Sequence, residues 1–221
     1  MGLPRRATVG PALVASSANN IALSQTPGAA GNLTLNGALV TGGVAVIGTA
    51  TGTAERITFT PAGAEATNST VWTVTGTDWN GNVVTETING VNNPATATST
   101  YDYKTVTQIA VNKAQAGAVT VGTAGVGASR PIFLDTFAPG PTGIQVDVSG
   151  TANYTVQSSL DNPNTITGGF PSCIWVNSSD TNVVNATTSL QSNFAYAPFM
   201  VRLVLNSGSG SATLTAQQLD M

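Results

Sequence analysis

The sequence contains no histidine, and only 8 % of its 221 residues are charged. Ordinary soluble domains carry roughly 25 % charged residues. The absence of histidine removes the commonest general base, the usual catalytic triads and the commonest zinc ligand. Seven basic residues are scattered along the chain and the net charge is −3, so no stripe of positive charge can follow a phosphate backbone. We therefore expect no nucleic-acid partner.

Cysteine and long apolar runs are equally scarce. The single cysteine, Cys173, excludes an intrachain disulfide, and no histidine is present to activate its thiol. We expect a small buried side chain there. Because no apolar run reaches the ~18 residues of a membrane-spanning helix, we expect no membrane association. The apolar patch around Pro11 is also too short and too polar for a secretory signal.

Threonine, serine, asparagine and glycine take the place of the missing charges, and the stretch from Val71 to Ile88 shows the pattern best. Its sequence VWTVTGTDWNGNVVTETI places β-branched and aromatic residues on both sides of Asn80-Gly81. Asn-Gly predicts a hairpin with a two-residue type I′ turn. The alternation predicts that threonines face water or another subunit, while the following residues point at a core: Trp72, Val74, Val84 and Ile88.

Further short alternating runs predict strands along the rest of the chain. In the first half they cover residues 32–39, 44–47, 56–61, 101–111 and 118–121. In the second half they cover residues 131–134, 143–148, 153–157, 174–176, 200–205 and 212–216, with hairpins expected through 149–152 and 207–210. No window shows the 3.6-residue period of a domain-forming helix. This pattern is typical of all-β sandwiches and barrels.

Proline and glycine divide the chain into segments. Pro4, Pro11 and Pro27 forbid a long helix over residues 1–30, which we interpret as an extended arm that docks on a neighbouring subunit, or else as a disordered leader. The glycine-rich stretch 122–130 indicates a domain boundary. We predict an all-β protein with two β-sandwich or jelly-roll-like domains, at residues 31–128 and 129–221, preceded by the arm at 1–30.

Oxygen ligands alternate over Asp78, Asn80 and Asn82, which weakly resembles a calcium loop. The match then fails, because the sixth position is Val83 instead of glycine and the twelfth is Asn89 instead of glutamate. A plain hairpin turn is the favoured interpretation.

Paired carboxylates would indicate glycoside hydrolysis, but no pair can be chosen from this sequence. Trp79 at the hairpin tip could stack on a sugar, although an aromatic residue there is more often a packing anchor. No phosphate loop or dinucleotide fingerprint occurs. We therefore assign no catalytic, cofactor-binding or metal-binding residue. The ten carboxylates are Glu55, Glu65, Asp78, Glu86, Asp102, Asp135, Asp147, Asp161, Asp180 and Asp220. N-x-S/T triplets begin at Asn32, Asn68, Asn177 and Asn185, among others, and no export signal supports their glycosylation.

Two parts of the chain resemble small β-rich virion proteins of tailed bacteriophages. The first is GTDWNGNVVTETINGV followed by YDYKTVTQIAVNKAQAGAVTVGT, and the second is GTANYTVQSSLDNP with AYAPFMVRLVLNSGSGSATLTAQQ. The resemblance covers most of residues 31–221 and is compositional, so it carries over no functional residue. It implies a non-enzymatic assembly protein of the virion, made in the bacterial cytoplasm.

We expect a capsid decoration or cement protein that binds the major capsid protein or other virion proteins, as a homo-oligomer without a cofactor. Low charge suits a protein that is packed against other proteins. The alternatives are a tail, adaptor or receptor-binding component that contacts host-surface glycans near Trp79, and a degradative enzyme on a β-scaffold.

Overall fold

The computed structural model describes residues 5–10, 13–48, 53–137, 141–167 and 169–218. Strands make up 52 % of the chain and helices 3 %, which confirms the all-β prediction. The helical residues form two single turns, η1 (Phe170–Ser172) and η2 (Thr181–Val183). Within the described ranges, no helix is long and apolar enough to cross a membrane.

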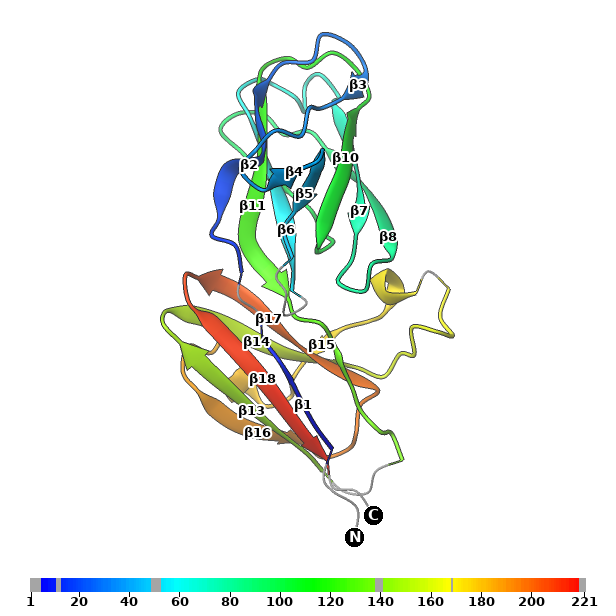
Figure 1. Cartoon of the computed structure of the whole chain (residues 1–221), viewed down its shortest axis with the longest axis vertical. Coiled ribbons are helices and arrows are strands. Elements are labelled where there is room, and N and C mark those ends of the chain that lie inside the picture. Colours follow the sequence, from blue (N-terminus) through cyan, green and yellow to red (C-terminus); the bar gives the residue numbers. More distant parts are fainter. Residues whose placement is uncertain (1–4, 11–12, 49–52, 138–140, 168, 219–221) are drawn as a thin grey trace. The chain divides into compact units, whose positions relative to one another are not determined.

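The chain forms two compact units (Figure 1). Unit 1 comprises the described residues of Met1–Leu13, Ala50–Thr53 and Gly127–Met221, and unit 2 those of Val14–Thr49 and Ala54–Val126. The main division at Val126 and Gly127 lies close to the expected boundary at 128. The remaining segments differ from the expected domains, because the N-terminal residues are shared between the two units.

Unit 2 contains two layers of antiparallel strands. One sheet has the order β4 (Val40–Thr41), β5 (Val44–Val46), β10 (Thr105–Val111), β7 (Val71–Thr77) and β8 (Val83–Asn89), and β3 (Gly31–Asn32) also pairs with β10. The facing strands are β2 (Ser17–Gln25), β11 (Val119–Ala128), β6 (Ala54–Pro61) and β9 (Ala97–Thr98), in that order of pairing. Figure 1 labels the strands of both layers except β9.

The core of unit 2 lies between these layers. The rings of Phe59 on β6 and Trp72 on β7 stack with centroids 4.6 Å apart, and both side chains are fully buried. Such a contact joins the inner faces of two packed sheets. The prediction that Trp72, Val74, Val84 and Ile88 face the core is confirmed, since none is more than 7 % exposed.

The hairpin connection between β7 and β8 corrects the predicted two-residue turn. Gly81 has a φ of +87°, but Asn80 does not have the positive φ that a type I′ turn requires. Gly81 N donates to Asp78 O (3.1 Å), and Asp78 N donates to Asn82 O (2.9 Å). These bonds define a three-residue loop with a bulge at Gly81. The Asp78 side chain accounts for the difference, because it accepts hydrogen bonds inside the loop.

The segment expected to be an arm supplies strands to both units. Residues Arg5–Val9 form β1, which pairs with β18 in unit 1, and Ser17–Gln25 form β2, which pairs with β11 in unit 2. Ile21 and Ala22 are fully buried in the core of unit 2. The prolines at 4, 11 and 27 exclude a helix but allow strands between them. The prediction of an extended conformation is therefore confirmed, but the prediction of an arm separate from the two domains is wrong.

Replacing Ile21 with alanine tests this correction. We expect Ile21→Ala to lower the free energy of unfolding by about 2–5 kcal/mol, because it leaves a cavity in a packed core. Leu23→Ala on the same strand is the matched control, since Leu23 is 45 % exposed. It should change stability by less than about 1 kcal/mol. Equal small effects of the two changes in urea unfolding would contradict the placement of β2.

The glycine-rich stretch 122–130, predicted to mark a domain boundary, contains the division between the two units at Val126 and Gly127 but is largely strand β11. A Cβ on Gly122 would lie 1.8 Å from the carbonyl oxygen of Ser17, so only glycine lets the backbone of β2 approach this closely. Gly125 has a φ of +68°. The composition therefore marks a close contact between two strands, which sequence patterns do not distinguish from a flexible connection.

Most of the strand predicted at residues 32–39 is a loop. Only β3 is strand there, although Leu33 N donates to Ile109 O (2.8 Å) and the Leu33 side chain is buried. Leu35 and Leu39 pack against the same core. The alternation of leucines thus reports burial correctly but not strand pairing.

Unit 1 is also a pair of packed sheets. The first sheet has the order β1, β18 (Ser211–Gln218), β13 (Thr142–Ser149) and β16 (Leu190–Phe194). The second contains β15 (Val176–Asn177), β14 (Ala152–Ser159) and β17 (Met200–Gly208), with β12 (Ile132–Phe133) and the end of β11 also paired to β17. Val146, Tyr154, Leu203 and Leu214 lie fully buried between the sheets.

The two hairpins predicted in this unit are wrong. β13 pairs with β18, and β14 pairs with β17, so neither chain connection joins neighbouring strands. Instead β13–β14 and β17–β18 run side by side as one antiparallel ribbon, which bends from the first sheet into the second. The bend lies at residues 149–152 and 208–211, where Gly210 N donates to Thr151 O (2.7 Å).

Glycine is required at this bend because the backbones of the two chain segments almost touch. Gly208 has a φ of +116°, and a Cβ there would lie 2.3 Å from Thr151 O. A Cβ on Gly210 would lie 2.4 Å from Ser149 O. The glycines that predicted hairpin turns therefore serve a different purpose, which is to let the ribbon pass from one sheet to the other.

We expect Gly208→Ala to destabilise the protein by about 2 kcal/mol or more, because alanine adds both backbone strain and a collision. Gly143→Ala is the control, since the nearest atom to its new Cβ is 3.8 Å away. The measurement is the midpoint of thermal unfolding for the two variants. A Gly208→Ala protein as stable as Gly143→Ala would contradict the close contact at the bend.

Candidate functional site

The loop at Asp78 is held together by hydrogen bonds within the protein. Asp78 Oδ1 accepts from Asn80 N (2.8 Å) and Asn82 N (2.9 Å), and Oδ2 accepts from Asn82 Nδ2 (3.1 Å). These donors occupy the carboxylate that a calcium ion would need. Among the described residues, no group of three or more His, Cys, Asp or Glu side chains could hold a metal ion.

Trp79 and Cys173, the other candidates, lie in different units. Trp79 is half-buried beside Asp78, so only part of its ring could meet a ligand. Cys173 is buried and free, and its Sγ donates to Gly169 O at 3.6 Å. Burial and the nearby Asp161 raise the pKa of the Cys173 thiol, an effect partly opposed by Arg202. A thiol held in its neutral form is a poor nucleophile.

Seven carboxylates accept a hydrogen bond from a backbone N–H group and thereby hold a loop or strand end in place. Asp102 instead pairs with Arg56 (3.7 Å), Asp147 accepts from Gln145, and Asp220 lies outside the described residues. None of these contacts forms an exposed acid pair of the kind that hydrolyses glycosides. The seven are Glu55, Glu65, Asp78, Glu86, Asp135, Asp161 and Asp180.

Glu55 is the carboxylate whose environment is most unusual. It is fully buried; Oε1 accepts from Val14 N, while Oε2 has no hydrogen-bond partner among the described residues. Burial raises the pKa of Glu55 to about 8, with a further contribution from Asp102 and an opposing one from the Val14 hydrogen bond. A raised pKa is common at catalytic acids, but the Glu55 side chain is fully buried. Its effect is therefore on stability.

The direction of this effect on stability depends on whether the folded or the unfolded state binds the Glu55 proton more tightly. Between the ordinary pKa of 4.5 and about 8, the folded protein keeps the Glu55 proton while the unfolded chain releases it. Stability from this group is therefore complete below about pH 4.5 and falls as pH rises toward 8, by at most about 1.4 kcal/mol per pH unit.

We expect Glu55→Gln to flatten the decline in unfolding free energy between about pH 5 and pH 8, because glutamine keeps the shape but does not ionise. Urea unfolding across this range measures the slope. Glu65→Gln is the control, since Glu65 is also fully buried but both of its carboxylate oxygens accept hydrogen bonds, from Gly117 N and from the Thr70 hydroxyl. An unchanged slope in Glu55→Gln would contradict a buried proton at this position.

The first surface feature of unit 1 is an exposed group of apolar side chains, which we name the apolar cluster. It surrounds a hollow of about 360 Å³ beside the edge strand β15. The one carboxylate that lines the hollow, Asp161, accepts from Ile174 N (2.6 Å). The cluster consists of Leu160 (69 % exposed), Ile174 (69 %), Val176 (60 %) and Tyr196 (58 %).

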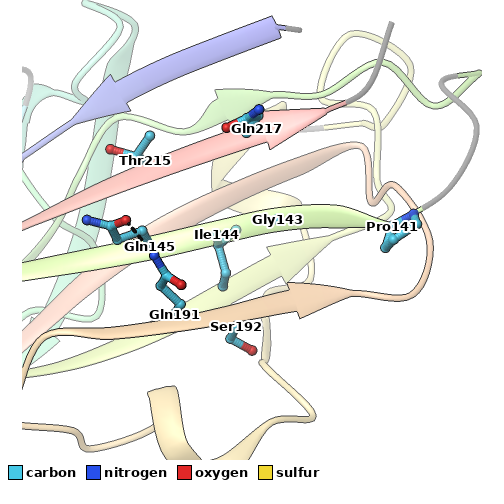
Figure 2. Close-up of a pocket in the computed structure, with 8 residues that line it drawn as sticks. All are labelled: Pro141, Gly143, Ile144, Gln145, Gln191, Ser192, Thr215 and Gln217. Atoms are coloured by element: carbon cyan, nitrogen blue, oxygen red, sulfur yellow. Dashed lines mark hydrogen bonds between the residues drawn. The ribbon is translucent and has the colours of Figure 1, made fainter. Parts of the chain in front are cut away.

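The second feature is a polar hollow of about 510 Å³ on the outer face of the sheet β18–β13–β16. Figure 2 shows the Gln145 and Gln191 side chains meeting between β13 and β16, with Thr215 and Gln217 on β18. Gln191 Nε2 donates to Gln145 Oε1 (3.0 Å), and Gln145 Nε2 donates to both carboxylate oxygens of Asp147 (2.8 and 3.0 Å). Neutral amides and hydroxyls thus dominate this face.

Sequence reasoning missed both features. The polar hollow joins residues about 70 positions apart (Gln145 to Thr215), which only strand pairing brings together. Gly143 gave a usable signal, because an isolated glycine in a strand marks a bulge or a close approach by another group. The exposed apolar residues gave no signal in the sequence. The pattern around Ile174 and Val176 is the same whether the strand is buried or exposed.

Comparison with known proteins identifies no relative: no protein-family model, no curated protein and no solved structure matches this chain.

Proposed function

We propose that this protein is a structural component of a tailed-bacteriophage virion, made in the bacterial cytoplasm, and that it decorates or cements the capsid. In this proposal it binds the major capsid protein or another virion protein and forms a homo-oligomer. The resemblance described for residues 31–221 supports the virion assignment. The exposed apolar cluster is the observation that carries the binding role.

The apolar cluster has the chemistry of a protein–protein contact. Its four large side chains are each more than half exposed and gather around one hollow, whereas single exposed apolar residues are ordinary. The Asp161 carboxylate at its rim accepts a hydrogen bond from Ile174 N, which lowers the cost of covering it. Burying such side chains contributes about 1.5–3 kcal/mol each.

The hydrogen bonds and the ion pair that the carboxylates make within the protein support a non-enzymatic role. Every acidic side chain among the described residues has a partner within the protein, and most fix a loop. The most strongly perturbed one, Glu55, is fully buried. The sequence also lacks histidine, the commonest general base.

The test uses particles assembled in cells that express the full chain. We expect the wild-type chain to co-purify with the particles, and the double change Ile174→Ser and Val176→Ser to reduce its occupancy at least about tenfold, because it removes apolar contact area. Mass spectrometry of purified particles measures the occupancy. Val83→Ser is the control, since Val83 is 73 % exposed but lies in unit 2.

Absence of the wild-type chain from particles would contradict the virion role. An equal loss of occupancy for Val83→Ser would contradict the specific role of the apolar cluster. All variants should unfold at nearly the wild-type urea concentration, because exposed substitutions change stability by only about 0.5 kcal/mol.

A further inference from the structure

The polar hollow exists because one side chain is missing from the outer face of the sheet. Gly143 on β13 pairs with Asn193 on β16 and with Gln217 on β18, so it occupies the middle of a cross-strand row. The next row is Gln191, Gln145 and Thr215. Because Gly143 has no side chain, its backbone lines the bottom of the hollow. The glutamines Gln145, Gln191 and Gln217 line its sides (Figure 2).

Hydrogen bonding fixes the direction in which the glutamine amides point. The Asp147 carboxylate only accepts, so Gln145 turns its NH₂ group toward Asp147 and its oxygen toward Gln191. Gln191 in turn uses its NH₂ group on Gln145. The row therefore has an ordered polarity, and ordered donors and acceptors cost a ligand less to engage than freely rotating ones.

The chemistry of the lining selects the class of ligand. The described lining residues present mainly amide and hydroxyl groups, which donate and accept hydrogen bonds without a formal charge. The neighbouring Asp147 carboxylate accepts hydrogen bonds from the Gln145 amide at both oxygens. An apolar ligand would strip water from the amides without replacing the lost hydrogen bonds. Sugar hydroxyls both donate and accept, and so match an amide and hydroxyl surface.

We propose that the hollow over Gly143 binds a neutral oligosaccharide. The amides of Gln145, Gln191 and Gln217 and the hydroxyl of Thr215 hydrogen-bond to the sugar hydroxyls, and the sugar ring rests on the backbone at Gly143. This site is separate from the apolar cluster and from Trp79, and it does not depend on the virion role.

Gly143 permits an unusually clean test, because a side chain there fills the hollow without disturbing the fold. Its φ is unstrained, and a new Cβ would have ordinary contact only with Gln217 O at 3.8 Å. A β-branched residue also suits a strand. Gly143→Val therefore blocks the site. Gly31→Val is the matched control, since Gly31 is an exposed strand residue with nothing within 4 Å of the added Cβ.

The experiment is saturation-transfer NMR on the full chain, with lactose, maltotriose and chitotriose as neutral probes and sialyllactose as the anionic comparison. We expect at least one neutral probe to bind the wild type and Gly31→Val, and to bind Gly143→Val and Gln191→Ala at least about tenfold more weakly. Thermal unfolding verifies that each variant is folded. If Gly143→Val fails to fold, Gln191→Ala decides the matter.

Three results would overturn the proposal: no neutral probe binds, sialyllactose alone binds, or Gly143→Val and Gln191→Ala bind like the wild type. A protein that binds neutral sugar but is absent from virions would support this site and contradict the proposed function. The two proposals therefore fail independently.

Discussion

The close approach of two chain segments at the glycine bend determines the architecture of unit 1. Gly208 and Gly210 lie so near the carbonyl oxygens of Thr151 and Ser149 that no other residue fits. Because this contact lets one ribbon pass from sheet to sheet, β13 and β18 face β14 and β17 across a single core. The outer faces that result are two separate surfaces, one neutral and polar and one partly apolar.

The scarcity of charge affects how those surfaces work. Most acidic groups accept hydrogen bonds from backbone N–H groups, and amides, hydroxyls and a few apolar side chains make up much of the exterior. Such a surface gains little from long-range electrostatic attraction. It depends instead on contact area and shape, which are effective where many copies are held close together.

The sequence was sufficient to predict the fold class and the core of the central hairpin. Two-residue alternation correctly placed Trp72, Val74, Val84 and Ile88 in the core. The errors at the turns share one cause, which is that glycine has several uses. Gly208 and Gly210 permit a bend between sheets and Gly81 forms a bulge, whereas the sequence pattern indicated simple turns. Gly122 permits a close strand contact inside the stretch that was predicted only as a domain boundary. The candidate surfaces were beyond prediction, because they combine residues that only the pairing of distant strands brings together.

The central claim is that this protein acts through its outer surfaces as a fixed part of a larger assembly. Electron cryomicroscopy of particles that contain the chain tests it most directly. The account predicts density for the two β units at repeated lattice positions, with Leu160, Ile174, Val176 and Tyr196 covered by a neighbouring protein. Density in which those side chains face open solvent, or a chain that occurs only as a free monomer with catalytic turnover, would contradict it.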